Sequence, residues 1–292
     1  MNYKKNLKRK SNWYIYLLTL MITTAVLFAV VYLMRGVLFS ETETVVNKNG
    51  TSDFRPPKSF DALTLLMLSE QKGATPDYYC LVSYQPRAEK VVFVTLRSDL
   101  SVKGGTSTMK LSDVYDRGGA KSAVKAITET YSLPVKFYAK FDKAAFIDIV
   151  SQIGNAPVNI PAPFQSGGTS FQAGSQNLDA ESLYNYITYK QRQMDDDDGG
   201  MVMGGALSKL IDANTRSLDT SRLQTIFAKL MNSADTSYTS ENFNDNLSAY
   251  LYTAGNSVSF AEYYVPYGET DSKGRFIPAE NSIGAVRERF GL

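Results

Sequence analysis

Histidine is absent from the 292-residue sequence, and cysteine occurs once, at Cys80. Without histidine there can be no Ser-His-Asp triad, no Cys-His dyad and no histidine-ligated iron, and a single cysteine excludes a zinc finger as well. One cysteine cannot form an internal disulfide, and we expect Cys80 to be a core residue of a strand. Any chemistry of this chain must therefore use carboxylates, cations and hydroxyl groups.

Charge is missing from one long stretch near the N-terminus. Residues 13–34, WYIYLLTLMITTAVLFAVVYLM, are 22 positions without a charged side chain. At a rise of roughly 1.5 Å per residue, a helix of this length covers a hydrocarbon core about 30 Å thick. A cleavable signal peptide is the competing interpretation, but the run exceeds a usual signal core and no clear small-residue cleavage site follows it. The pattern favours one uncleaved transmembrane helix.

The charges on either side of this run predict its orientation. Five cations precede it within residues 1–12, whereas Arg35 and then Glu41 and Glu43 follow it. The positive-inside rule predicts a cytoplasmic N-terminal tail over residues 1–12 and a single-pass protein of the cell membrane. Residues 35–58 are rich in small polar residues and predict an extracytoplasmic stalk, which leaves residues 59–292 as the extracytoplasmic domain.

The segment after the apolar run is slightly acidic. Residues 36–292 hold 25 of the 31 basic residues and all 29 acidic residues, a formal charge of 25 − 29 = −4. They contain no basic stripe with interleaved aromatic residues, so we expect no nucleic-acid partner.

Apolar periodicity predicts the fold of this domain. Buried strands are expected at 62–68, 78–84 and 90–96, with further strands at 135–141, 157–161 and 257–266. Helical patterns cover 120–133, 146–154, 181–193, 203–213, 222–232, 241–254 and 282–290. Strands interleaved with helices that must cover both sheet faces predict an α/β domain, a three-layer α/β/α sandwich with a mixed central sheet.

Two conspicuous motifs have ordinary structural explanations. The tetrad Asp195–Asp198 offers oxygen ligands to a divalent cation, but it fits no EF-hand, and a run of like charges is more typical of a solvated loop. The paired glycines and the Gly/Ser segment 165–175 form neither a phosphate-binding loop nor a dinucleotide fingerprint, so turns and loops are the simpler interpretation.

Charged residues at the ends of the predicted strands are more informative, because ligands of open α/β sheets bind where the strands finish. The residues concerned are Glu70, Lys72, Asp77, Arg97, Asp99 and, after a Gly/Ser/Thr loop, Lys110. If the first and third strands are neighbours, these carboxylates and cations converge and suit a divalent metal and a diphosphate. The alternative is that strand ends are polar because they are solvated.

Several segments together resemble the LytR-CpsA-Psr family of membrane-anchored extracytoplasmic proteins of Gram-positive and related bacteria. LLMLSEQK is similar to the family's opening strand, and PDYYCLVSYQP with KVVFVTLRSDLSV is similar to its next two strands. MKLSDVYDRGG resembles the segment after these strands, SLPVKFYAKFDKAAFIDIVSQIG with VNIP is the most similar stretch, and YVPYGE and FIPAENSIGAVRERF resemble the closing strand and helix.

The resemblance implies transfer of an anionic glycopolymer from a polyprenyl-pyrophosphate carrier to peptidoglycan, with release of lipid phosphate. It implies a Mg²⁺ held by Asp77 and Asp99, and a catalytic role for Arg97 and Asp99. The side chains that it implies for substrate binding are Glu70, Lys72, Lys110, Lys190 and Arg192. Metal and guanidinium groups would neutralise the charge that develops on phosphoryl oxygens.

The sequence also departs from the family pattern. Ser98 stands at the arginine position of the third strand, with Arg97 displaced by one residue, and a one-residue shift on a strand turns a side chain to the opposite face. Thr188, Met201 and Gly204 stand at other arginine positions. Each lost charge-assisted hydrogen bond is worth about 1.5 to 3 kcal/mol. Two hypotheses therefore remain: a divergent glycopolymer transferase, and a catalytically inactive member that binds a lipid carrier or an envelope partner as a regulator or scaffold.

Overall fold

The computed structural model describes residues 62–105, 107–193, 196–256 and 261–292, all within a unit that spans Arg55–Leu292. Among the helices described, none is long and apolar enough to cross a membrane. The segments predicted as tail, transmembrane helix and stalk, residues 1–12, 13–34 and 35–58, lie outside the described residues.

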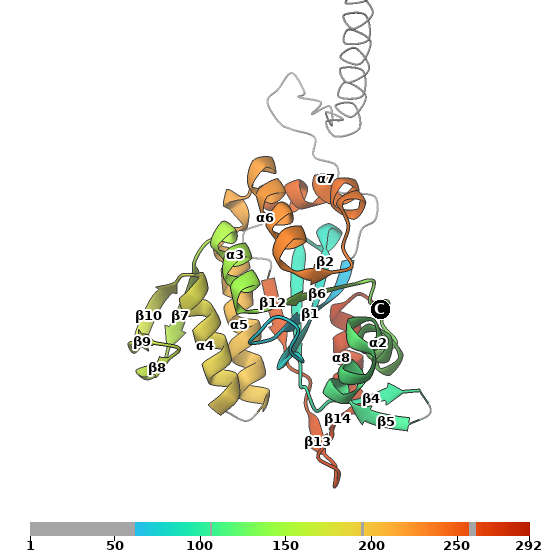
Figure 1. Ribbon diagram of the computed structural model, residues 1–292. Coiled ribbons are helices and arrows are strands. Elements are labelled where there is room, and N and C mark those ends of the chain that lie inside the picture. Colours follow the sequence, from blue (N-terminus) through green and yellow to red (C-terminus); the bar gives the residue numbers. More distant parts are fainter. Residues whose placement is uncertain (1–61, 106, 194–195, 257–260) are drawn as a thin grey trace, which may run out of the picture. The chain divides into compact units, whose positions relative to one another are not determined.

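A six-stranded mixed sheet forms the centre of the domain (Figure 1). Its order is β11 (Asp235–Thr236), β6 (Phe137–Phe141), β1 (Ala62–Leu68), β2 (Tyr78–Gln85), β3 (Lys90–Leu96) and β12 (Ala261–Tyr264). The β1–β6 and β3–β12 pairs are parallel, and the other pairs are antiparallel. The first and third strands are not neighbours, because short connections make β1, β2 and β3 a meander with β2 in the middle.

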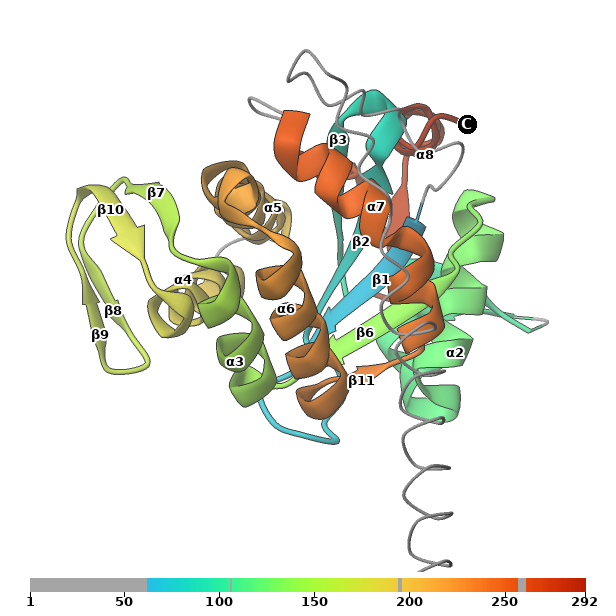
Figure 2. The same cartoon turned by 90° about the horizontal axis from the view of Figure 1, so that it is seen from above.

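Helices pack on both faces of this sheet, since apolar residues alternate along its strands. Leu65, Leu81 and Val94 point into one core, shared with α2 (Leu111–Tyr131) and α8 (Glu280–Arg289). Cys80 and Phe93 point into the other, shared with α3 (Lys143–Ile153), α4 (Ala180–Gln193) and α5 (Asp196–Asn214). Cys80 is fully buried, as predicted. In Figure 2, α6 (Thr220–Ser233) and α7 (Ser240–Asn256) lie on the α3 side of the sheet, opposite α2.

Short antiparallel strand pairs lie outside the central sheet. The hairpins are β4 (Ser101–Gly104) with β5 (Ser107–Lys110), β8 (Phe164–Ser166) with β9 (Thr169–Phe171), and β13 (Gly268–Thr270) with β14 (Phe276–Pro278). The strands on either side of β8–β9, β7 (Ala156–Ile160) and β10 (Gly174–Leu178), pair with each other in antiparallel fashion. Two 3₁₀ turns, Pro86–Ala88 and Thr215–Ser217, complete the elements. The expectation of a plain loop over 165–175 is wrong: Phe164 stacks on Phe171 and on Tyr189, with ring centroids 4.5 and 4.3 Å apart, which orders the segment as strands.

Two helices start earlier than their periodicity predicts. α2 begins at Leu111 rather than near residue 120, and it is interrupted at Gly119, whose φ of 65° lies in the left-handed region. α5 begins at Asp196, so at least residues 196–198 of the acidic tetrad are helical rather than loop. Acidic residues are favourable in the first turn of a helix because they face the positive end of its dipole.

Candidate functional site

One edge of the sheet, which we call the rim, collects the ends of several strands. Since β1, β3, β6 and β12 run in the same direction, their C-terminal ends lie at this edge, where β2 begins. The rim therefore carries the loop 69–77 after β1, the turn 97–100 after β3 and Asp142 after β6. The meander produces this edge even though β1 and β3 are not adjacent.

Arg97 and Asp99 form an ion pair in the turn after β3. Arg97 donates from Nε and Nη2 to the two carboxylate oxygens of Asp99, each at 2.9 Å, and the side chains are 18% and 21% exposed. The guanidinium lies 4.5 Å from the ring centroid of Phe276, and the Phe276 amide donates to the Asp99 carbonyl. Strand alternation does not govern Arg97 because β3 ends at Leu96, so the displaced arginine still reaches the neighbouring aspartate.

A small cavity of about 40 Å³ lies beside this pair. Asp77 and Arg97 line it together with Thr95 and Gly200. Thr95 is 4% exposed, and its hydroxyl has no hydrogen-bond partner among the described residues. Gly200 approaches so closely that a Cβ there would lie 2.7 Å from Thr95 Oγ1. Because buried hydroxyls are rarely left unsatisfied, Thr95 marks a place for a ligand oxygen or an ordered water.

A second rim cavity, of about 340 Å³, opens beneath the loop 69–77. Lys72 and Lys140 line it with Tyr115, Asp142 and Asp235. Lys140 is only 7% exposed; its ammonium donates to the Ala74 carbonyl and, at 2.7 Å, to the Tyr115 hydroxyl. Lys140 was not predicted as a site residue, because the only signal in the sequence was a charged position inside a predicted strand.

A hydrogen bond fixes the loop 69–77 to the first part of α2. The Thr75 hydroxyl donates to the Asp116 carboxylate at 2.5 Å, next to Tyr115 on the same helix. The rim is thus connected to α2 as well as to the sheet.

The other predicted site residues are spread more widely. Glu70 is exposed on the loop after β1, and Lys110 precedes α2, with its Nζ 3.6 Å from where a Cβ of Gly274 would lie, close to the β13–β14 turn. Lys190 and Arg192 belong to α4, but their side chains lie outside the described part of the structure. The structure therefore brings Arg97 together with Asp99, and places Asp77 and Lys72 in the two rim cavities.

The donor set at the rim is compatible with Mg²⁺, although it is sparse. No group of three or more His, Cys, Asp or Glu side chains arranged to hold a metal occurs among the described residues. Mg²⁺ needs fewer, since it commonly uses one or two carboxylates together with water and substrate phosphates. Asp77 is exposed at the smaller cavity, whereas both oxygens of Asp99 accept from Arg97. Asp99 would have to share an oxygen between the guanidinium and a cation.

The family model LytR_cpsA_psr matches residues 40–290. The chain belongs to this family. Among curated proteins it is 23% identical over 137 residues to the polyisoprenyl-teichoic acid–peptidoglycan teichoic acid transferase TagU of Bacillus mycoides, covering 45% of each chain. It is 25% identical over 181 residues to TagU of Bacillus subtilis, covering 60% of this chain and 58% of that protein. The chain thus spans about half the length of these relatives.

Several solved structures share the fold of this chain. B. subtilis TagV aligns with a TM-score of 0.65 at 19% identity, covering 80% of this chain and 97% of that chain. TagT bound to LIIa-WTA aligns with a TM-score of 0.63 at 18% identity, covering 86% and 96%. A chain from Eubacterium siraeum, described as a transcription regulator, aligns with a TM-score of 0.74 at 21% identity, covering 86% of this chain and 99% of that chain. At these identities the alignments establish a common mixed α/β fold.

The structure describes the surroundings of Thr188, Met201 and Gly204, the residues that we expect at arginine positions of the LytR-CpsA-Psr pattern. Thr188 is buried and donates to the Tyr184 carbonyl at 2.9 Å, within its own helix. Gly204 faces Tyr263 so closely that a Cβ would lie 2.8 Å from the tyrosine Cβ. Met201, one turn earlier, is 46% exposed. The space beside Gly204 is filled by a tyrosine, so an arginine would require β12 or α5 to move.

Proposed function

We propose that this chain transfers an anionic glycopolymer from a polyprenyl-pyrophosphate carrier to peptidoglycan during assembly of the cell envelope. The observation that carries the proposal is the Arg97–Asp99 pair at the rim, next to a cavity that contains Asp77 and the unpartnered hydroxyl of Thr95. The names of the curated relatives, which are teichoic acid transferases acting between a polyisoprenyl carrier and peptidoglycan, support it.

The rim offers the groups that a diphosphate needs. Arg97 presents a planar fork that can exchange the carboxylate of Asp99 for phosphate oxygens, because both are bound bidentately. Lys72 and the buried Lys140 would hold further negative charge in the larger cavity. Asp77 and Asp99 would hold Mg²⁺, which supplies neutralisation of the charge on the diphosphate oxygens. Glu70, Lys110, Lys190 and Arg192 remain proposed substrate contacts.

The transfer would replace the phosphoanhydride bond of the carrier by a phosphodiester bond to the acceptor. An acceptor hydroxyl of peptidoglycan attacks the phosphorus that bears the glycan, and the bond from this phosphorus to the bridging oxygen breaks. The polyprenyl monophosphate leaves with that oxygen, and the hydroxyl proton passes to a base. Arg97 would stabilise the charge on the phosphoryl oxygens during this step.

The proposed location follows from the same chemistry. We propose a single-pass protein of a Gram-positive-type cell membrane, with its N-terminus in the cytoplasm and the described domain outside. The charge-free run 13–34, with cations before it, supports this orientation.

Lipid phosphate release tests the activity. The full chain in detergent, given a polyprenyl-pyrophosphate glycan, peptidoglycan and Mg²⁺, should release polyprenyl phosphate, and Asp99→Asn should abolish the release. Asp245→Asn is the matched control, because Asp245 is exposed on α7, which packs near the 3₁₀ turn after β2 rather than at the rim. Equal release by Asp99→Asn and wild type would contradict the proposed role of the rim.

A second candidate function is binding without turnover, as a regulator or scaffold. The packing of Gly204 against Tyr263 and the burial of Thr188 favour it, because these positions provide no guanidinium for the phosphates. Saturable binding of the carrier with no release of lipid phosphate would support this alternative.

A further inference from the structure

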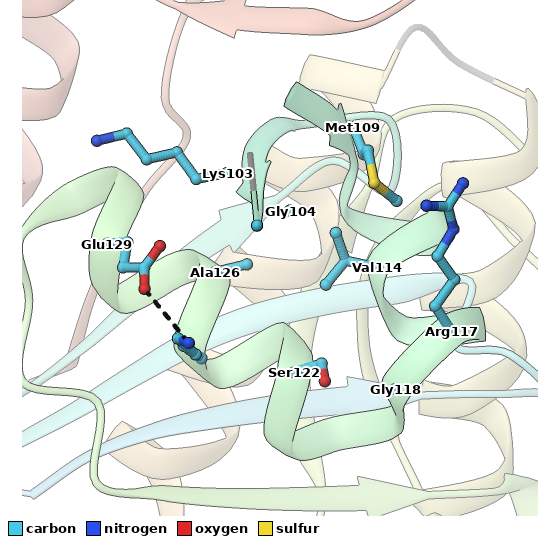
Figure 3. A pocket seen from close by; sticks show the side chains of 11 residues that line it. Lys103, Gly104, Met109, Val114, Arg117, Gly118, Ser122, Ala126 and Glu129 are labelled. Carbon is cyan, nitrogen blue, oxygen red and sulfur yellow. Dashed lines mark ion pairs between the residues drawn. The ribbon is translucent and has the colours of Figure 1, made fainter. Parts of the chain in front are cut away.

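A cleft of about 370 Å³ lies away from the rim cavities, between the β4–β5 hairpin and α2 (Figure 3). Its floor is apolar: Met109, Val114 and Ala126 line its middle. Gly104 allows the hairpin to approach the helix, since a Cβ there would lie 3.3 Å from the Val114 side chain of α2. The packing of the hairpin against the helix therefore forms the cleft.

Cations surround this apolar floor. In Figure 3, Lys103 and Arg117 lie on opposite sides of Gly104, and Val114 lies between Gly104 and Arg117. Among the described residues, neither the Lys103 ammonium nor the Arg117 guanidinium takes part in an ion pair.

One carboxylate accompanies these cations. Glu129 pairs with Lys125 at 3.9 Å, and the Lys125 side chain is 79% exposed, so solvent screens this pair strongly. Lys103, Arg117 and Lys125 against Glu129 leave the lining with an excess of positive charge. Residues 36–292 as a whole carry a formal charge of 25 − 29 = −4, so the cleft is a local exception.

The cleft and the rim share one stretch of α2. Val114 and Arg117 line the cleft, whereas Tyr115 lines the larger rim cavity and Asp116 accepts from Thr75 of the rim loop. The cleft and the larger rim cavity are therefore lined by consecutive residues of the same helix, Val114 and Tyr115.

We propose that the cleft binds the phosphodiester chain of an anionic glycopolymer, beyond the diphosphate held at the rim. This inference rests on the proposed function. Separated cations match phosphates that recur along a chain, and the apolar floor matches the C–H faces of the sugar or polyol units between them. A polymer can place several phosphates among these cations at once, so it should bind more tightly than inorganic phosphate.

Binding of a lipid-free polymer tests the cleft directly. The probe is soluble poly(glycerol phosphate), titrated against the full chain in detergent. The double variant Lys103→Gln/Arg117→Gln should raise the Kd by about five- to tenfold, as expected for two exposed ion pairs. The control variant Lys121→Gln/Lys136→Gln removes the same charge from exposed lysines that do not line the cleft, and it should change the Kd by less than about twofold.

Three results would overturn the inference: equal weakening by the control variant, wild-type binding no tighter than that of inorganic phosphate, or no binding of the polymer. A parallel titration with a polyprenyl diphosphate that carries no polymer separates this inference from the proposed function. The cleft variant should bind that carrier like wild type. If the polymer binds and the carrier does not, the inference about the cleft is supported and the proposed function is refuted. If the carrier binds and the polymer does not, only the inference about the cleft is refuted.

Discussion

Adjacent glycines of α5 should respond in opposite ways to the same substitution. Alanine in a helix interior is more favourable than glycine by about 1 kcal/mol. At Gly205 the new Cβ would meet the Tyr263 ring at 3.5 Å or more, an ordinary contact, so Gly205→Ala should stabilise the domain by up to about 1 kcal/mol. At Gly204 the Cβ would lie 2.8 Å from the Tyr263 Cβ, which is anchored to the backbone of β12. Overpacking costs about 1 to 3 kcal/mol, so Gly204→Ala should be neutral or lose up to about 2 kcal/mol.

Thermal unfolding of the two variants, followed by circular dichroism under identical conditions, measures this difference. Since 1 kcal/mol shifts the Tm of a domain of this size by about 2 to 4 °C, a difference of about 1 to 3 kcal/mol means that Gly205→Ala should melt above Gly204→Ala by about 2 to 12 °C. Gly284→Ala in α8 is a further control, because a Cβ there meets nothing within 4 Å. If Gly204→Ala matches or exceeds Gly205→Ala in stability, then Tyr263 does not close the space beside Gly204.

Three further predictions concern other parts of the domain. Arg97→Lys should lose a hydrogen bond to Asp99 and the Phe276 stack, lowering the Tm by about 2 to 4 °C for a loss near 1 kcal/mol; an unchanged melting curve would contradict the bidentate pair. The Cys80 thiol is buried, and burial raises its pKa, so a thiol reagent should label it only after unfolding; immediate labelling of the native chain would place it at the surface. Hydrogen bonds from Arg275 lower the pKa of Asp271 from 3.8 to about 2, so the ionised carboxylate should stabilise the domain fully above pH 3.8, and this stabilisation should disappear as the pH falls through 2. When the free energy of unfolding is measured against pH, Asp271→Asn should remove the loss of stability in this pH range. If the variant keeps that loss, another carboxylate is responsible for it.

The central strands and most helices were predictable because their signals are local. The runs at 62–68, 78–84 and 90–96 are mostly apolar, as is typical of strands buried on both faces, and they match β1, β2 and β3 within one residue. The hairpin over 164–171 was not predictable in this way. Its order comes from the stacking of Phe164 on Tyr189, which lies on a helix and is distant in sequence.

In the candidate site too, contacts between residues close in sequence were predictable and contacts between distant segments were not. Arg97 and Asp99 are two residues apart, so their association required only a turn after the strand. Lys140 joined the rim through contacts with Ala74 and Tyr115, which no spacing in the sequence indicates. The tight approach of Gly204 to Tyr263 likewise depends on how α5 lies against β12. Contacts between distant segments are what the sequence pattern could not provide.

The support of the Arg97–Asp99 pair by Phe276 ties the rim to the β13–β14 hairpin. The ring beside the guanidinium and the amide that donates to the Asp99 carbonyl both come from β14. A substitution in this hairpin should therefore displace the guanidinium without changing any residue of the turn that carries it.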